Sequence, residues 1–338
     1  MLSFGVTVLP DPPYSRFLEL IGLAEQHGFE YGWTYDSHLL WQEPYPFLTA
    51  AALATETIKL GLCVTNPGTR EPTVTASASA TLQDISGGRM VFGIGRGDSA
   101  RRTIGYEPVP MAEFERACEM IKGLMNGRTV SWNEKELVLP WAVEQPEIPL
   151  YVAGYGPKAL AVAGRRSDGV IIQLADPDII EWVMGQARAA AAEAGRDPSA
   201  LEAIVCAPCV IGDDPASARD QVRWFPAMVS NHVFDLLQRY DRSLLPERLT
   251  AYLDRREFYD YSEHSRMGAK HGAFVDDETC DRFCILGSVE DHIEKLRELE
   301  SIGVTQWNIY LMTERPEETL ELYGREIIPR LREAGIEA

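Results

Sequence analysis

Three side chains suited to proton chemistry stand together in Asp36-Ser37-His38, directly after the apolar segment 31–35. A histidine at the end of a strand can donate a proton or polarise a carbonyl group. The sequence therefore offers Asp36 and His38 as candidate catalytic residues. A structural histidine, or one that only contacts the substrate, explains the same pattern equally well.

A second group of residues has the chemistry of an anion site. Gly154-Tyr155-Gly156-Pro157-Lys158 follows an apolar segment and precedes a helical pattern. Glycines let a ligand approach the backbone, proline suits the first helical position, and free amides at a helix start attract negative charge. The loop is compatible with a phosphate site, and also with a simple strand-to-helix turn.

Basic side chains gather in two short stretches of an acidic chain. Such local positive charge can oppose an anionic ligand. Arginines scattered over the surface by chance explain any single one of them equally well. The residues are Arg89, Arg96, Arg101 and Arg102 in the first stretch, and Lys158, Arg165 and Arg166 in the second.

Buried strands position these loops. Segments 58–64 and 90–94 are short and apolar, which is typical of parallel strands covered on both faces. Asn66-Pro67-Gly68 is a turn, and the small residues of 73–85 predict a helix that ends at a glycine pair. In a β/α barrel, the loops that follow the strands form the active-site face.

Strand and helix alternate through most of the remaining chain, which implies a parallel sheet. Barrel closure does not follow from this pattern. A hairpin is expected at 130–139, and a helical insertion at about 214–280 that is too long for a simple crossover. Further strands are expected at 3–9, 149–153, 169–173, 201–211 and 306–312, and helices at 15–26, 111–125, 157–164, 179–194, 290–301 and 316–334.

Length and composition predict one large domain over 1–338. With 338 residues and 45% hydrophobic content, the chain can bury a single core of barrel size. A formal net charge of -19 disfavours nucleic acid and anionic membranes as partners. We expect no membrane span and no basic signal-peptide start. Six cysteines in so long a chain favour a reducing, cytoplasmic setting.

Four cysteines have a spacing that bears on metal binding. Cys206-Ala-Pro-Cys209 is a C-x-x-C, and Cys280 and Cys284 lie downstream. A redox C-x-x-C opens a helix, whereas this one continues in a strand-like pattern. A zinc site needs all four cysteines to converge. The sequence therefore predicts no metal site.

Several motifs carry a family resemblance: Gly61-x-x-Val-Thr-Asn-Pro67, Ile85-Ser-Gly-Gly-Arg89 and Gly93-Ile-Gly-x-Gly-Asp98, continued through 153–160 and 167–171. In these motifs the chain resembles the luciferase-like flavin and deazaflavin oxidoreductases, and most of all the methylenetetrahydromethanopterin reductases that use coenzyme F420. The resemblance implies a TIM (β/α)8 barrel with insertions. It is weak from about 213 to 281.

The resemblance also implies where the cofactor lies. In the family, the peptide bond corresponding to Cys63–Val64 is cis and forms a bulge behind the deazaflavin ring, and the loop corresponding to 154–158 holds the phosphate. Barrels in general bind phosphate after strands seven and eight, so the general rule and the resemblance differ. The implied cofactor-binding residues are Cys63, Val64, Thr65, Asn66, Gly95, Arg96, Gly154, Tyr155, Gly156, Pro157 and Lys158.

Three positions depart from the family pattern. Relatives place Asp-His together after the second strand, whereas Ser37 here separates Asp36 from His38. Sugar-phosphate-oxidising relatives have a glutamate after the Gly-Ile-Gly loop, where this chain reads Arg101-Arg102. Methanopterin reductases have a glutamate in the first strand, where this chain has Thr7. The last two departures argue against a sugar phosphate and against a methanopterin as the substrate.

The resemblance predicts an oxidoreductase that transfers hydride between F420 and a small organic substrate. Two alternatives stay open: an FMN-dependent monooxygenase, and a non-catalytic flavin-binding barrel. The small residues 77–80 permit close approach of a second helix, and relatives pair in this part of the barrel. A homodimer is therefore expected.

Overall fold

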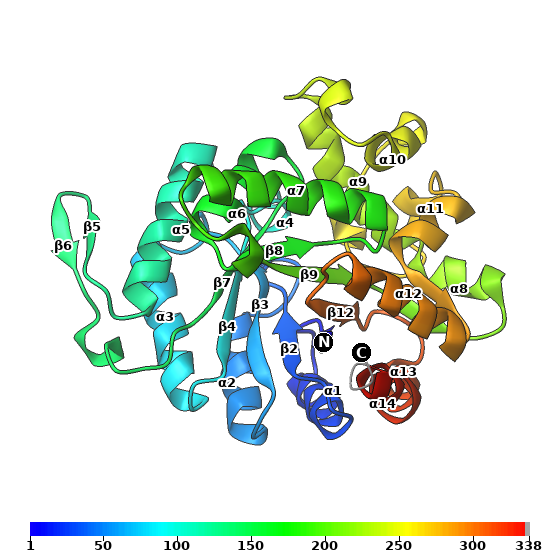
Figure 1. Ribbon diagram of the computed structural model, residues 1–338, viewed down its shortest axis with the longest axis horizontal. Coiled ribbons are helices and arrows are strands. Elements are labelled where there is room, and N and C mark those ends of the chain that lie inside the picture. Colours follow the sequence, from blue (N-terminus) through cyan, green and yellow to red (C-terminus); the bar gives the residue numbers. More distant parts are fainter. Residues whose placement is uncertain (335–338) are drawn as a thin grey trace.

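Short apolar segments form a closed barrel of parallel strands at the centre of the molecule (Figure 1). The computed structural model describes residues 1–334. Within them, every neighbouring pair of barrel strands is parallel, and β1 closes the barrel against the last strand. The predicted (β/α)8 barrel is thus confirmed. Its strands are β1 (Ser3–Thr7), β2 (Tyr31–Thr34), β3 (Lys59–Thr65), β4 (Met90–Ile94), β7 (Leu150–Ala153), β8 (Gly169–Ile172), β9 (Glu202–Ala207) and β12 (Gln306–Tyr310).

Helices surround the barrel because each presents an apolar face to the strands. In the first of them, Phe17, Leu20, Ile21 and Ala24 are buried at the spacing that the sequence predicts. The helices are α1 (Tyr14–Gln26), α2 (Pro44–Ala54), α3 (Pro72–Ile85), α5 (Met111–Met125), α6 (Pro157–Arg166), α7 (Pro177–Glu193), α12 (Val289–Ser301), α13 (Pro316–Leu322) and α14 (Ile328–Ala334).

Two elements differ from the sequence prediction. The helix α2 was not expected, because apolar residues run along most of its length without a clear polar face. The strand expected at 201–211 is two strands, β9 and β10 (Cys209–Ile211), separated at Pro208. Proline has no backbone N–H to donate, so the ladder breaks there.

A hairpin projects from the side of the barrel, as the sequence predicts (Figure 1). Its strands β5 (Val130–Trp132) and β6 (Lys135–Leu137) pair antiparallel. Asn133 and Glu134 form the turn with φ values of 49° and 61°. Both central residues therefore adopt the left-handed conformation of a tight hairpin.

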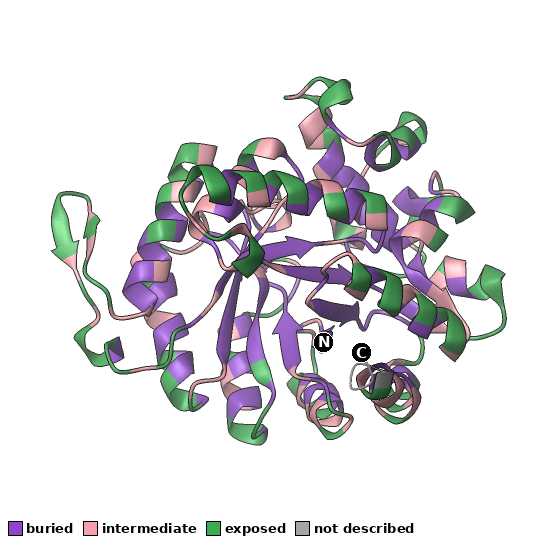
Figure 2. Ribbon diagram, in the orientation of Figure 1, coloured by how far each residue is buried: buried purple, intermediate pink, exposed green. Residues whose placement is uncertain are grey.

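Helices and turns occupy the segment between β10 and β11 (Ile285–Gly287), two strands that pair in parallel at its base. This insertion segment contains α8 (Pro215–Val222), α9 (Trp224–Leu237), α10 (Glu247–Thr250) and α11 (Asp277–Phe283). Most of α9 is buried, as the purple colour of this helix shows in Figure 2. The insertion segment is therefore packed onto the barrel along α9.

The predicted homodimer stays a prediction. Of the small residues on α3, Ser79 and Ala80 are buried within the chain, and only Ser77 and Ala78 are partly exposed. Nearby apolar side chains on α2 and α3 are more exposed, with Leu53 at 74% and Val74 at 55%.

Among the residues described, no helix combines the length and hydropathy needed to cross a membrane.

Candidate active site

A cavity of about 340 Å³ opens where several barrel strands end. Residues that follow β2, β3, β4, β7 and β8 line one part of its wall, and α9 with His264 from the insertion segment lines the other. Because all barrel strands are parallel, their carboxyl ends meet at this one face. The insertion segment completes the wall that the strand loops leave open.

Most of the site residues expected from the sequence line this cavity. Two do not. Pro157 is the first residue of α6 and is not part of the wall, and His38 is exposed. The residues that do line it are Asp36, Cys63, Val64, Thr65, Asn66, Gly95, Arg96, Gly154, Tyr155, Gly156 and Lys158.

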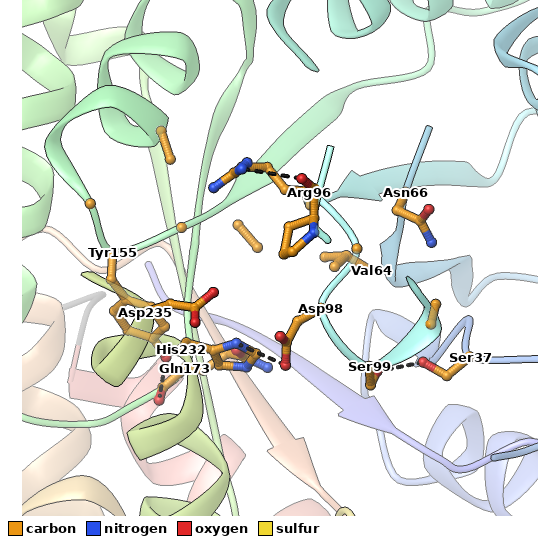
Figure 3. A pocket seen from close by; sticks show the side chains of 18 of the residues that line it. Ser37, Val64, Asn66, Arg96, Asp98, Ser99, Tyr155, Gln173, His232 and Asp235 are labelled. Carbon is orange, nitrogen blue, oxygen red and sulfur yellow. Dashed lines mark hydrogen bonds and ion pairs between the residues drawn. The ribbon is translucent and has the colours of Figure 1, made fainter. Parts of the chain in front are cut away.

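His38 is outside the cavity because the chain turns sharply after β2. The amides of Leu40 and Trp41 both donate to the carbonyl of Ser37, at 2.9 and 3.0 Å. This turn directs Ser37 and Trp41 to the cavity and leaves His38 on the outer side. The expectation that His38 reaches the reacting groups is therefore corrected. Ser37 stands in its place and shares a hydrogen bond of 2.6 Å with Ser99 (Figure 3).

Asp36 lines the cavity but its carboxylate is occupied. Both of its oxygens accept hydrogen bonds from Arg70, and Thr65 Oγ1 donates to Oδ2 at 2.6 Å. Arg70 also bonds Glu43 at 2.6 Å. Burial opposes the charge of Arg70, but the two carboxylates outweigh it and raise the pKa of the guanidinium. Asp36 is thus suited to hold the wall in shape, because both of its oxygens already accept hydrogen bonds.

The peptide bond between Cys63 and Val64 is cis, as the resemblance implies. The register between β3 and β4 shifts between Leu62 and Thr65 at the same place. Val64 reaches the cavity, and a Cβ built on Gly95 would lie 3.1 Å from Val64 Cγ2. A glycine at this position of the next loop leaves room for the bulge.

The glycine loop before α6 is tightly packed. A Cβ on Gly154 would lie 2.7 Å from Ala159 Cβ, and a Cβ on Gly156 would lie 2.6 Å from Leu236 Cδ2 of α9. No side chain caps the first turn of α6. The loop therefore brings bare backbone to the cavity at the start of a helix, which is a favourable place for an anion.

Three basic side chains line the cavity with few acidic partners. Arg96 donates to the carbonyl of Val109 at 2.7 Å, and burial, followed by the nearby Arg239, lowers the pKa of Arg96. Arg239 comes from the insertion segment, and its nearest carboxylates are at 3.8 and 4.0 Å. Lys158 is exposed, and in residues 1–334 it makes no ion pair. Together they make this part of the cavity attractive to an anion.

A cavity carboxylate that the sequence analysis overlooked is Asp98, the last residue of the Gly-Ile-Gly-x-Gly-Asp motif. Arg102 Nε donates to Oδ1 at 2.9 Å, Asn231 donates to Oδ2 at 2.8 Å, and the Tyr261 hydroxyl lies 3.1 Å from Oδ1. Burial opposes ionisation, but His232, His264 and Arg102 together lower the pKa of Asp98. Asp98 is therefore a charged anchor between the β4 loop and the insertion segment.

Two cavity histidines also come from the insertion segment, where the sequence offered no motif to identify them. Burial lowers the pKa of His264 to about 3, and its Nδ1 contacts the Tyr259 hydroxyl. His232 has a side chain that is 25% exposed, and its ring stacks on Tyr155 with centroids 6.2 Å apart. Both histidines line the cavity, but His264 is buried and His232 is the more exposed of the two.

Thr7 does not reach the cavity. Its hydroxyl donates to Asn308 Oδ1 at 3.2 Å inside the barrel, and the residue is fully buried.

All six cysteines are buried and free. In the described part of the chain, no group of three or more His, Cys, Asp or Glu side chains is arranged to hold a metal ion.

A second cavity, of about 240 Å³, lies where barrels usually bind phosphate. It follows β9 and β12, the seventh and eighth barrel strands, and is bordered by α8 and α13. Its wall includes Asp213, Asp214, Glu314 and Glu318, against the single basic residue Arg315. This negative wall disfavours an anion, so the glycine loop before α6 is the better candidate.

Comparisons with known proteins agree with this arrangement. The 5,10-methylenetetrahydromethanopterin reductase of Archaeoglobus fulgidus is 33% identical, over 98% of this chain and 100% of the relative. The protein of the same name from Methanolobus tindarius is 31% identical, over 97% and 100%. The solved structure of the coenzyme F420 dependent tetrahydromethanopterin reductase from Methanopyrus kandleri has a TM-score of 0.77 and 27% identity, over 98% of this chain and 99% of that one.

The sequence profile of a family described as "Luciferase-like monooxygenase" matches residues 2–306. This match includes all strands of the barrel up to the start of β12, together with the cavity and the insertion segment. The chain therefore belongs to the luciferase-like monooxygenase family.

Proposed function

We propose that this protein transfers hydride between coenzyme F420 and a small organic substrate in the main cavity. The full-length relatives named as methylenetetrahydromethanopterin reductases support the reaction class. The similar structure from Methanopyrus kandleri, whose name includes coenzyme F420, supports the cofactor. The protein itself contributes a cavity with basic side chains beside the uncapped start of α6.

The observation that carries this proposal is the charge arrangement around the uncapped start of α6. Lys158, Arg96 and Arg239 line one cavity together with the glycine loop, in a chain with a net charge of -19. The alternative barrel position after β9 and β12 is acidic. Of these two cavities, only the main cavity therefore favours an anionic cofactor.

The residues present fit a phosphate-bearing deazaflavin. Lys158 and the first amides of α6 would hold its phosphate, and Cys63 and Val64 would lie beside its ring. When bound, the cofactor supplies or accepts a hydride at carbon, which none of the amino-acid side chains can do. The protein positions the reactants, and its largely apolar walls limit access of water.

The substrate is proposed only as a small organic molecule. Thr7 is turned toward Asn308 within the barrel, so β1 offers no carboxylate where the methanopterin reductases have a glutamate. The cavity wall near Ser37 is instead formed by hydroxyl, aromatic and imidazole side chains. A polar substrate without a strong positive charge suits this wall.

Charge reversal at Lys158 tests the proposal. Purified protein should bind F420, and Lys158→Glu should weaken this binding at least tenfold, or about 1.4 kcal/mol, because a carboxylate would face the phosphate. Lys135→Glu is the matched control, since Lys135 is exposed on the β6 hairpin away from the cavity. Equal affinities for both variants would remove the α6 loop from the site.

FMN is the alternative cofactor, and a binding-only barrel the alternative role. A parallel titration with FMN separates the two cofactors by relative affinity and by absorption spectrum. Reduced deazaflavin is stable in air, whereas reduced FMN reacts with oxygen. Tighter binding of FMN with oxygen consumption would favour a monooxygenase. Cofactor binding without turnover of any alcohol, aldehyde or imine tested would favour the binding role.

A further inference from the structure

We propose that His232 exchanges a proton with the substrate and that Asp98 is the positioning residue that holds its imidazole. This inference rests on the proposed function, because the proton accompanies hydride transfer. It concerns a residue of the insertion segment, where the family resemblance is weak.

The position of His232 is suitable. The residue lies on α9, lines the cavity, and places Nδ1 3.6 Å from Asp98 Oδ2 (Figure 3). The face of its ring stacks on Tyr155 with an interplanar angle of 23°. A ring held by one stacked neighbour and one carboxylate has a defined direction. With Nδ1 toward Asp98, Nε2 is the nitrogen left for a ligand.

Asp98 itself is unsuited to donate the proton. Its oxygens already accept from Arg102, Asn231 and Tyr261, and its pKa is lowered by the surrounding basic groups despite burial. A carboxylate stabilised in this way stays charged in neutral solution. Its remaining effect on the cavity is to orient the imidazole of His232.

The other candidate groups are also excluded by their surroundings. His264 is neutral because burial lowers its pKa to about 3. The Tyr155 hydroxyl donates to the carbonyl of Gln173 at 3.0 Å, and burial raises the pKa of this phenol. Burial likewise raises the pKa of Tyr35. His38 is outside the cavity.

Charged and titratable groups surround His232 on each side. Asp98 follows β4, Tyr155 follows β7, and His264 lies in the insertion segment close enough to interact electrostatically with His232. Asp235 is on the same helix and is paired with Arg102, which also binds Asp98. The two acidic groups near His232 therefore share Arg102, and Asp235 is also paired with Arg239 at 3.8 Å.

The proposed step balances as a reduction of a polar double bond. With a reduced cofactor bound, a hydride would be added to the substrate carbon, and the proton of His232 Nε2 would be added to the oxygen or nitrogen. The C=O or C=N double bond would become a single bond, and solvent would return a proton to the imidazole while the oxidised cofactor would release one. In the oxidation direction, the imidazole takes the proton from the alcohol or amine.

The first experiment compares His232→Gln with His27→Gln, a histidine at the end of α1 on the opposite side of the barrel. General acid–base catalysis contributes typically 10²–10⁴-fold, so kcat of His232→Gln should fall at least about 100-fold with unchanged cofactor affinity. The pH–rate profile should lose one limb, because the group that exchanges the proton is absent. His27→Gln should keep the limb and the rate.

A readout without cofactor accompanies the kinetics. In nuclear magnetic resonance spectra of cofactor-free protein, the imidazole signal that is missing from His232→Gln should shift in Asp98→Asn, because His232 Nδ1 lies 3.6 Å from Asp98 Oδ2. The signal of His292 should not shift, because its ring lies between Tyr323 and Val210. A His232 signal that is the same in Asp98→Asn and in the wild type would overturn the proposal.

Asp98→Asn tests the positioning role. His232→Asn is a second variant of the histidine and is used if His232→Gln fails to fold. The Asp98 change should lower kcat at least about tenfold, leave KM for the cofactor unchanged, and shift the His232 imidazole signal. A His232 variant that binds F420 and keeps the wild-type pH profile contradicts the proposal. A wild-type protein that binds neither F420 nor FMN instead removes the proposed function.

Discussion

At the scale of single residues, the cavity separates side chains that are occupied from side chains that are free. Asp36 and Asp98 are each held by an arginine and further donors. Lys158 and His232 have few such partners. The second kind can change partner when a ligand arrives, whereas the first kind keeps the wall in shape.

Cys63 tests how closely the wall fits its ligand. The residue is 2% exposed, and its Sγ lies 3.9 Å from Cys206 Sγ and 4.0 Å from Asn308 Nδ2. Cys63→Phe should cost about 1–3 kcal/mol of stability through overpacking, and should weaken cofactor binding at least about tenfold. Cys63→Ala should bind cofactor as the wild type does. Thermal unfolding and cofactor titration measure the two effects.

Cys118→Ala is the control for Cys63, because Cys118 is fully buried on α5 and does not line the cavity. It should lower stability without changing cofactor affinity. If Cys63→Phe binds cofactor normally, the ring does not lie against this part of β3. In that case, alkylation of Cys63 in the wild-type protein should not inhibit it either.

At the scale of elements, α9 is the part of the insertion segment that completes the site. It contributes Met228, His232, Asp235 and Leu236 to the cavity. Arg102, at the end of the short helix α4 (Ser99–Arg102), connects the β4 loop to α9 by pairing with Asp98 and Asp235. The docking of α9 therefore depends on a few ionic contacts in addition to its apolar face.

Removing Arg102 should loosen α9. Arg102→Gln leaves two largely buried carboxylates without their shared partner, which costs about 1–3 kcal/mol. Amide hydrogen exchange in Trp224–Leu237 should accelerate, while exchange in the barrel strands stays slow. Arg242→Gln breaks the exposed pair with Asp254 and the bonds to Thr250, and should leave exchange in α9 unchanged. Equal effects of the two changes would show that α9 is held by apolar packing alone.

At the scale of the whole molecule, two buried histidines make stability depend on pH. Burial lowers the pKa of His264 to about 3 and the pKa of His292 to about 4. In the unfolded chain, a histidine titrates near about 6.5. Between about pH 6.5 and 4, the unfolded chain therefore binds more protons than the folded protein. By linkage, the free energy of unfolding must decrease as the pH falls through this window.

Thermal unfolding as a function of pH checks this consequence. The Tm should be nearly constant just above pH 7 and should fall as the pH is lowered from about 6.5 to 4.5. His292→Gln should reduce the slope, because His292 is fully buried between Tyr323 and Val210. His27→Gln should keep the wild-type slope. A slope that is unchanged in His292→Gln would mean that other groups cause the pH dependence.

Much of the fold is encoded locally. Seven of the eight barrel strands come from the expected apolar segments, and β9 with β10 from the eighth, because buried parallel strands need continuous apolar residues. The hairpin turn at Asn133-Glu134 follows from local turn chemistry. So does the end of α1, which Gly28 follows with a φ of 81°. Motifs around Cys63 and Gly154 indicated the family, and most of the site residues expected from these motifs line the cavity.

The remaining features depend on contacts between distant parts of the chain. Whether His38 or Ser37 faces the cavity is decided by one turn, which the residue types alone do not specify. The role of Asp98 depends on Asn231 and Tyr261, more than 130 positions away in sequence. A local sequence pattern predicts which segments are strands and which are loops, because backbone conformation depends mainly on neighbouring residues. Which side chains of the insertion segment line the cavity depends on how this segment packs onto the closed barrel.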